Sequence, residues 1–168
     1  ANACFIGVKT EGDFRDDVIY LWGGTYFHCY DVWKKVSVDK IYKKWFHLCL
    51  VYDGEKIVLY FNGRKIGERR VSINTLKYLF RVGRQINNGP EYFPGIIDEI
   101  RIYNRALSRS EIEALYRGVD IRKGLVFYLT FDHLSGKEIK DDLSQYYTGE
   151  IYGSPKEYYH QPPKTVSL

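Results

Sequence analysis

The chain has 168 residues, 45% of them apolar and 17% aromatic, and its 25 Lys and Arg against 21 Asp and Glu leave a net charge of +4. This length predicts one domain with its own hydrophobic core. Pairs of cations at 34–35, 43–44 and 69–70 are interpreted as a solvated edge rather than the dense stripe of a nucleic-acid-binding protein. No apolar run approaches the ~20 residues of a membrane span. We therefore expect neither a nucleic-acid partner nor a transmembrane segment.

The first half of the sequence consists of short β-prone stretches separated by turn residues. Strands are predicted at 3–9, 18–22, 26–32, 45–52, 56–61 and 65–71. Asp53-Gly54 and Asn62-Gly63 separate the last three, and such pairs are strong hairpin signals because both residues tolerate positive φ. The chain between 45 and 71 should therefore form a three-stranded antiparallel meander.

The second half predicts a helix between further strands. The strands are expected at 78–82, 95–103, 124–131 and 149–152, with a polar loop at 132–144. Ser108 and Glu111 have the spacing of a capping box at the start of a helix over 109–117, Leu107 and Ile112 occupy the staple positions, and Gly118 follows its end. Many short strands with one short helix predict an all-β fold. A tail at 154–168 holds three of the five prolines and is expected to be irregular.

Three cysteines, Cys4, Cys29 and Cys49, fall within predicted strands, and their spacing matches no zinc or redox signature. One pair could bridge neighbouring strands, or all three could be buried free thiols, and the sequence leaves both possibilities open. The chain contains no Met, so we expect a processed or excised piece, and a removed secretory signal would fit.

Two stretches of the sequence resemble laminin-G-like domains of the concanavalin-A-like superfamily. WFHLCLVYDG at 45–54 and LYFNG at 59–63 are similar to the central hairpin of the family. VGR at 82–84, followed by FPGIIDEIRIYNRALSRSEI at 93–112, resembles its closing strand and helix entry. The resemblance implies a two-sheet antiparallel jelly-roll sandwich with one short helix.

The C-terminal part resembles the opening of the same kind of domain, through GLVFYLTFD at 124–132 and GEIYG at 149–153. In the family this stretch precedes the central hairpin, so the order of segments is rotated here. The strands could complete a circularly permuted domain spanning 1–153, begin a following domain, or complete a neighbouring subunit by strand exchange. Permutation is favoured because a severed domain would leave unpaired sheet edges. Asp141 matches a family aspartate and is expected to cap a turn.

The candidate catalytic groups do not form a set that suits hydrolysis. Enzymes of this fold cleave polysaccharides with paired carboxylates at alternate positions of one strand, whereas Asp98 and Glu99 are adjacent and belong to opposite faces. We therefore predict a protein that is not an enzyme. Related sandwiches often hold one Ca²⁺ where the closing strand meets the opening strand, and the resemblance implies Asp98 and Asp132 as its ligands here.

The candidate binding residues are aromatic. Trp22, Tyr26, Trp33 and Tyr42 lie at predicted strand ends or in loops, where rings could stack on sugars. The resemblance implies a secreted or cell-surface module, lectin-like or adhesive, that binds a glycan or a cell-surface protein. The rotated order also supports an alternative: a structural subunit of an extracellular filament, sheath or virion, forming a homo-oligomer by strand exchange.

Overall fold

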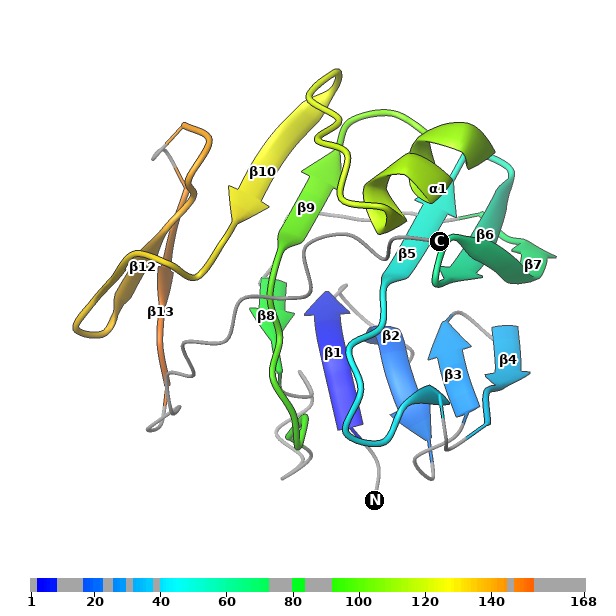
Figure 1. The fold of residues 1–168 in the computed structure, drawn as a ribbon, viewed down its shortest axis with the longest axis horizontal. Coiled ribbons are helices and arrows are strands. Elements are labelled where there is room, and N and C mark those ends of the chain that lie inside the picture. The colour runs from blue at the N-terminus through cyan, green and yellow to red at the C-terminus, as the bar shows by residue number, and fades with distance from the viewer. Residues whose placement is uncertain are drawn as a thin grey trace. The chain divides into compact units, whose positions relative to one another are not determined.

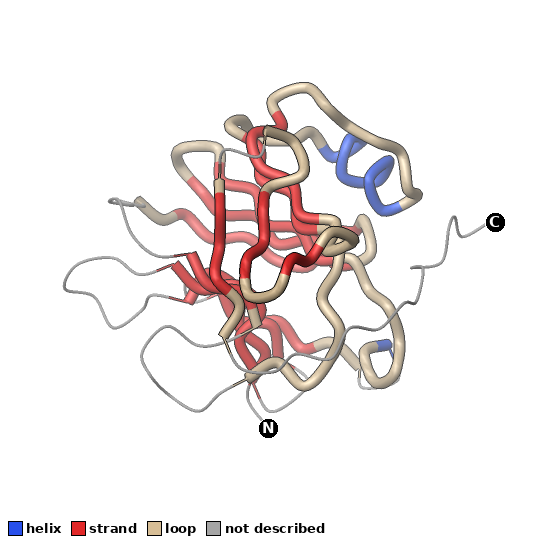
Figure 2. Tube along the Cα trace, turned by 90° about the vertical axis from the view of Figure 1, so that its left-hand side faces the viewer, coloured by secondary structure: helices blue, strands red, loops and turns tan. Residues whose placement is uncertain are grey.

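The structure, a computed structural model, describes residues 3–8, 17–22, 26–29, 32–37, 40–72, 80–83, 92–144 and 147–152. The chain divides into two compact units, residues 1–95 and 96–168. Strands dominate the described residues (Figure 2). Every described strand pairs with its neighbours in the same unit in the antiparallel sense. The expectation of an all-β fold with one short helix is confirmed. The tail predicted at 154–168 lies outside the described residues.

The first unit contains a five-stranded sheet. Its strands are β1 (Ala3–Val8), β2 (Asp17–Trp22), β3 (Tyr26–Cys29), β4 (Val32–Lys35) and β8 (Phe80–Val82), in the order β4-β3-β2-β1-β8 (Figure 1). The prediction of a single strand over 26–32 is wrong, because β3 ends at Cys29 and β4 pairs back onto it from Val32. The connection between them contains Asp31, a residue type that favours turns.

The second sheet of this unit is the predicted meander, which is confirmed. It consists of β5 (Leu48–Tyr52), β6 (Lys56–Phe61) and β7 (Arg64–Arg70). Asn62 has a φ of 50° and Gly63 a φ of 73°, as the turn between β6 and β7 requires. The Asn62 side chain also accepts a hydrogen bond of 2.8 Å from the His47 amide, which anchors the turn to the start of β5.

A hydrophobic core forms around β6. Leu59 and Phe61 are buried together with Val36, and the Phe46 and Phe61 rings stack with centroids 5.6 Å apart. Val58 and Tyr60, which alternate with the core residues along β6, are also buried. The strand is thus covered on both faces, which explains its nearly continuous apolar sequence.

The second unit contains two small sheets. β9 (Ile100–Tyr103) pairs with β10 (Leu125–Leu129), and β11 (Leu134–Ser135), β12 (Glu138–Lys140) and β13 (Thr148–Glu150) form the other sheet. The prediction of a loop throughout 132–144 is wrong, since β11 and β12 form a hairpin there, with Gly136 at a φ of 63°. The hairpin carries mostly polar, exposed residues, so it lacks the alternating apolar pattern by which strands are recognised.

The pairing of β9 with β10 bears on the rotated order of segments. β10 lies in the stretch that resembles the opening of the family, and β9 in the stretch that resembles its closing strand. In the structure the two are antiparallel neighbours within one chain, with Leu129 opposite Ile100 and Tyr128 opposite Arg101. This contact is the one that a permuted domain requires, and the permutation itself stays a prediction.

Helix α1 (Arg109–Tyr116) begins as predicted. Ser108 and Glu111 form the capping box, and Leu107 and Ile112 are both buried. Arg105 reinforces this end with two charge-assisted hydrogen bonds to the Glu111 carboxylate, of 2.9 and 2.6 Å. Gly118 follows the helix with a φ of 83°. With eight residues α1 is too short to cross a membrane, and no other described helix is long and apolar enough to do so.

We expect Ser108→Ala to lower the free energy of unfolding by about 1 kcal/mol, because the Glu111 amide loses its acceptor at the helix N-terminus. Chemical denaturation followed by circular dichroism measures the loss. Ser110→Ala makes the same chemical change in the first turn of α1 and removes only a hydroxyl contact with Ser108. Equal losses for the two variants would show that the cap adds no stability.

Of the three cysteines, Cys49 is the one whose side chain the structure describes. Cys49 is a free thiol, and burial raises its pKa to about 12, so it stays protonated at neutral pH. Cys4 belongs to β1 and Cys29 to β3, with β2 between them. Two strand spacings place their Cα atoms about 10 Å apart, beyond the ~7 Å that a disulfide spans. A bridge between Cys4 and Cys29 is therefore not expected, although the side chains of these two residues lie outside the described part of the structure.

Candidate functional site

The register of the five-stranded sheet brings aromatic residues onto one face. Trp22 is opposite Tyr26 in the β2–β3 pair, and Tyr26 is opposite Lys35 in the β3–β4 pair. Residues opposite each other in an antiparallel pair share a face, and so do residues two apart along a strand. The next row of partners, in which His28 is opposite both Tyr20 and Trp33, therefore belongs to the same face. We call this side of the sheet the aromatic face, and its residues are Tyr20, Trp22, Tyr26, His28, Trp33 and Lys35.

The other face of the same three strands has a different composition. Leu21 is opposite Phe27, and Cys29 is opposite Val32. Its residues are apolar, Cys29 included, apart from Lys34, at the edge strand, and Asp17, at the start of β2. A sheet with one apolar and one mixed aromatic and polar face is typical of an antiparallel sheet that packs a core on one side only.

Three of the four predicted binding residues share this face, and the fourth does not belong to it. Trp22, Tyr26 and Trp33 lie on the aromatic face, whereas Tyr42 lies in a turn after β4. Tyr42 is 66% exposed and has the Lys43 ammonium 5.4 Å from its ring centroid. Sequence reasoning missed Tyr20 and His28. The spacing in the sequence could have indicated both residues. Tyr20 lies two positions before Trp22 and His28 two positions after Tyr26, so in a hairpin all four residues share a face.

The two predicted calcium ligands flank the same end of the β9–β10 pair in the sequence. Asp98 precedes β9 and Asp132 follows β10, and the last paired residues are Ile100 and Leu129. Burial raises the pKa of Asp98 to about 6, and the Glu99 and Asp132 carboxylates add to this, against a hydrogen bond from the Glu99 amide and the charge of Arg101. The repulsion from Asp132 indicates that the two carboxylates lie close enough to interact.

The backbone has a left-handed conformation next to each of these two aspartates. Glu99 has a φ of 58° and Phe131 a φ of 60°, although neither is a glycine. This conformation costs roughly 1 kcal/mol or more for a residue with a Cβ, and such residues concentrate at functional sites.

Glu99 is held by its own partners and is not an obvious third ligand. Its carboxylate accepts a hydrogen bond of 2.7 Å from the Tyr128 hydroxyl and forms a salt bridge of 2.7 Å with Arg101. The Arg101 guanidinium lies 4.4 Å from the centroid of the Tyr128 ring. Burial and the bond to Glu99 raise the pKa of Tyr128 to about 12. Tyr128 therefore stays protonated at neutral pH. Among the described residues no group of three or more His, Cys, Asp or Glu could hold a metal ion.

Asp141 is fully buried and organises the turn that follows β12. Its carboxylate accepts hydrogen bonds from the main-chain amides of Tyr128, Leu143 and Ser144, at 2.8, 3.3 and 2.9 Å, and one from the Ser144 hydroxyl. Burial by itself raises the pKa of Asp141, but the bonds from Ser144, Tyr128 and Leu143 outweigh it and leave the pKa below its usual range. The prediction that Asp141 caps a turn is confirmed, and its bond to Tyr128 ties the turn to β10.

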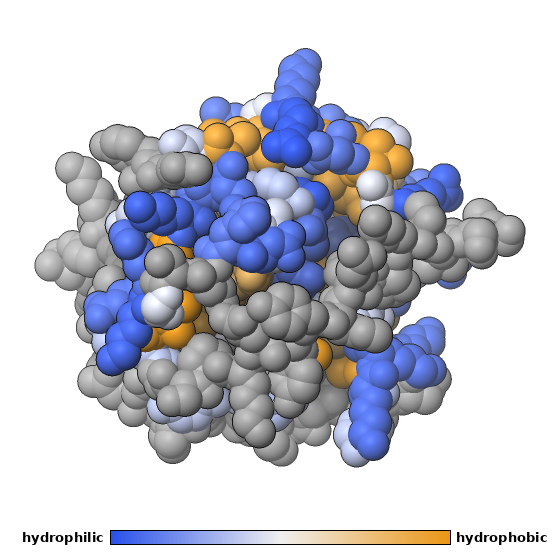
Figure 3. All heavy atoms as spheres, turned by 60° about the vertical axis from the view of Figure 1, so that its left-hand side comes forward, coloured by the Kyte–Doolittle hydropathy of each residue, from blue (hydrophilic) through white to orange (hydrophobic). Residues whose placement is uncertain are grey.

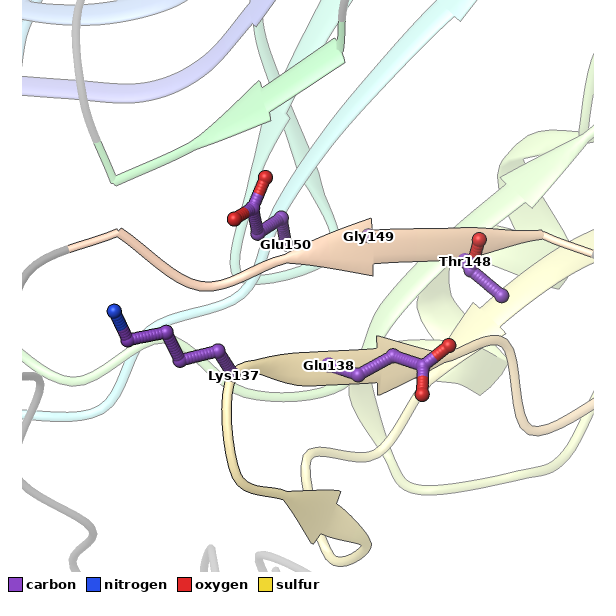
Figure 4. A pocket seen from close by; sticks show the side chains of 5 residues that line it. All are labelled: Lys137, Glu138, Thr148, Gly149 and Glu150. Carbon is purple, nitrogen blue, oxygen red and sulfur yellow. The ribbon is translucent and has the colours of Figure 1, made fainter.

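An open hollow lies on the β12–β13 hairpin (Figure 4). It is lined by Lys137, Glu138, Thr148, Gly149 and Glu150. Glu138 and Glu150 are register partners, but their carboxylates extend in different directions, and Glu150 accepts a hydrogen bond from Tyr152. Figure 3 shows hydrophilic side chains over much of the described surface on its side of the molecule, with small apolar patches between them. The hollow thus has neither the aromatic lining of a sugar site nor a convergent acid pair.

Comparison with solved structures supports the fold. A candidate carbohydrate-binding protein from Bacteroides ovatus superposes with a TM-score of 0.60 at 19% identity, over 90% of this chain and 50% of that one. This chain therefore spans half the length of that protein, and at this identity the likeness shows the fold alone. An S-layer domain-containing protein from Clostridium thermocellum has a TM-score of 0.38 at 21% identity, over 68% of this chain and 62% of that one, which is too low to carry an argument.

The family of the chain follows from a match to a protein-family model. No curated protein sequence matches the chain. The model of the Laminin_G_3 family, described as the concanavalin A-like lectin/glucanases superfamily, matches residues 2–113, which include the meander, the aromatic face and the start of α1. With two thirds of the chain matched, and a structure of antiparallel sheets with a single described helix, this chain belongs to the laminin-G-like branch of the concanavalin A-like β-sandwiches.

Proposed function

We propose that this chain is a non-catalytic carbohydrate-binding module and that its ligand lies across the aromatic face. The observation that carries the proposal is the register of β2, β3 and β4, which collects Trp22, Tyr26 and Trp33 on one side of the sheet. The family membership supports a lectin-like role, and the likeness to the Bacteroides protein is consistent with it. A secreted or cell-surface location, with a role in adhesion, belongs to the same proposal.

The chemistry of sugars suits such a face. A pyranose ring has an apolar face of C–H groups and a rim of hydroxyls. Aromatic side chains offer large apolar surfaces at low entropic cost, and a few polar groups beside them fix the orientation of the ligand. Tyr20, His28 and Lys35 supply hydrogen-bonding groups within the same two rows. A row of alternating rings and polar groups is a suitable platform for successive residues of a polysaccharide.

The described acidic residues support a role without catalysis. Glycoside hydrolysis requires two carboxyl groups about 5–10 Å apart, on either side of the bond that is cleaved. No described strand position on the aromatic face is an Asp or Glu. Glu99 is engaged by Arg101 and Tyr128. These observations support a binding role within a superfamily that also includes glucanases.

The test is binding to a panel of polysaccharides by affinity electrophoresis, followed by titration of tryptophan fluorescence with the best ligand. We expect retardation by at least one polysaccharide, a fluorescence change on binding, and no release of reducing sugar. The chain has only three Trp, and two of them lie on the aromatic face. Binding that leaves the fluorescence unchanged would place the site elsewhere, and steady release of reducing ends would make the chain an enzyme.

A structural subunit assembled by strand exchange is the second candidate. It is favoured by the contact between β10 and β9, because the segment that resembles the opening of the family pairs there with the closing strand. The same contact could form between copies if β10 were donated to a neighbour, with the segment around α1 as the hinge. Size-exclusion chromatography across a range of concentrations decides: polymers support exchange, and a monomer at every concentration excludes it.

We also propose a structural Ca²⁺ between Asp98 and Asp132. The donor chemistry fits, because a hard cation prefers oxygen ligands and would relieve the repulsion that raises the pKa of Asp98. With two carboxylates at hand, the remaining oxygens would come from main-chain carbonyls and water. The ion would stabilise the end of the β9–β10 pair.

We expect saturating Ca²⁺ to raise the melting temperature by about 5 °C relative to a chelator, since binding at 100 times the dissociation constant is worth about 2.7 kcal/mol. Asp98→Asn should abolish this increase. In chelator the same variant should be as stable as the wild type or slightly more stable at neutral pH. The reason is that an acid with a raised folded-state pKa lowers stability as pH rises from its unfolded value of about 4 through 6.

Differential scanning fluorimetry with and without Ca²⁺ measures both effects. Glu138→Gln, which removes an exposed acid on the β12–β13 hairpin, is the control and should keep the Ca²⁺ response. A melting temperature that is the same in Ca²⁺ and in chelator would remove the metal from the proposal.

A further inference from the structure

The positive charge of the chain is concentrated in one segment. Residues 31–72 contain ten Lys and Arg against five Asp and Glu, a net charge of +5, whereas the whole chain has +4. The rest of the chain is therefore slightly acidic, with 15 basic against 16 acidic residues. This segment spans β4 to β7, so the excess of cations belongs to particular strands rather than to the surface in general.

Two edge strands of the first unit present these cations together. β4 is the outer strand of the five-stranded sheet and β7 is an outer strand of the meander, and the two strands are in contact. We call their exposed basic residues the cationic edge: Lys34, Lys35, Arg64, Lys65, Arg69 and Arg70.

A single acid lies within these two strands, and it is already neutralised. The Glu68 carboxylate is 2.7 Å from the Lys65 ammonium and 2.9 Å from that of Lys56. The hydrogen bonds from these lysines lower the pKa of Glu68 to about 2, so it remains ionised and paired at neutral pH. With six cations and one carboxylate, the sequences of these two strands carry a net formal charge of +5, and an edge of this charge attracts an anionic polymer by long-range electrostatics.

The cationic edge and the aromatic face meet on β4. Trp33 and Lys35 are two residues apart and lie on the same face, and Lys35 is also the register partner of Tyr26. A ligand that runs along the row from Trp22 through Tyr26 arrives at Lys35 and then at the cations beyond it. Such a row places two aromatic residues next to a positive charge at the edge of the sheet.

We infer that the ligand is an acidic polysaccharide built of uronic acids, whose rings lie on the aromatic face and whose carboxylates reach the cationic edge. The inference rests on the proposed carbohydrate-binding function and names the class of sugar. A neutral glucan would use the rings and leave the cations without a role in binding. Edge-strand lysines that serve only to prevent aggregation would produce no preference between charged and uncharged sugars.

The test compares polygalacturonate with its fully methyl-esterified form, which has the same sugars without the charge. We expect the acid form to bind at least about tenfold more tightly, a difference of 1.4 kcal/mol, and the preference to fade at high salt because the contacts are exposed and screened. The double variant Arg64→Gln/Arg70→Gln, which removes two exposed cations of β7 outside the aromatic face, should lose most of the preference while its binding of the ester is unchanged. Lys140→Gln, an exposed cation on β12, is the matched control and should behave as the wild type.

Each other outcome is decisive. Equal binding of the acid and the ester overturns the inference and leaves the proposed carbohydrate-binding function standing. Failure to bind any polysaccharide removes the proposed function as well. Tighter binding of single-stranded DNA than of polygalacturonate also overturns the inference, because rings and cations in one row can serve bases and phosphates too.

Discussion

Replacing Asp141 by Ala is expected to lower the free energy of unfolding by about 3 kcal/mol or more. The carboxylate is fully buried and accepts four hydrogen bonds from groups on β10 and on the turn at 141–144. Alanine leaves the buried amide of Tyr128 without an acceptor, which costs more than the bond itself contributes. Asp141→Asn should also be destabilising, because its NH₂ group would face an amide donor in place of one carboxylate oxygen.

The same network predicts how stability depends on pH. The pKa of Asp141 is lower in the folded chain than in the unfolded chain, so the unfolded state binds more protons in the interval between the two values. The contribution of Asp141 is therefore fully present above about pH 4 and is lost as the pH falls through the folded-state value. Asp141→Ala should lack this part of the acid transition.

Urea denaturation at neutral and acidic pH measures both effects. Glu138→Gln is a suitable control, because it removes an exposed acid from the neighbouring β12. If Asp141→Ala were within ~0.5 kcal/mol of this control, the size expected of a surface substitution, the network would not hold β10 to the turn.

The elements that the sequence predicted well are those with local signals. The hairpin at Asn62-Gly63 and the helix start at Ser108 depend on residues a few positions apart, and both lie where they were expected. The β11–β12 hairpin was missed because Leu134 and Ile139 are its only apolar members. The break between β3 and β4 was missed because apolar and aromatic residues continue on both sides of it.

The candidate site depended on pairings that no local pattern reveals. Trp22, Tyr26 and Trp33 could be chosen as aromatic residues near strand ends, but their common face follows from the register of two hairpins. The meeting of Asp98 with Asp132 required the pairing of β9 and β10, and it could be expected from the family resemblance alone. From the sequence, the cation pairs at 34–35 and 69–70 are interpreted as a solvated edge. That these pairs belong to neighbouring strands follows from the tertiary contact between β4 and β7, which no local pattern predicts.

The aromatic face leads to the second large effect, on binding. Each of Trp22→Ala and Trp33→Ala should weaken polysaccharide binding about 30-fold, since a buried tryptophan at the centre of a contact contributes about 2 kcal/mol. The two residues stand in different rows, so the double variant should lose close to the sum of both effects, or about 1,000-fold. Isothermal titration calorimetry with the best polysaccharide ligand measures these losses.

The third tryptophan provides the control. Trp45 precedes β5, is half-buried, and is not among the paired positions of the five-stranded sheet. Trp45→Phe keeps an aromatic ring there and should bind as the wild type does, while it shares the loss of one indole with the other variants. Thermal denaturation separates weaker binding from unfolding. If the Trp22 and Trp33 variants are folded and bind like Trp45→Phe, the ligand does not use the aromatic face, and a site on the Tyr42 turn would become the better hypothesis.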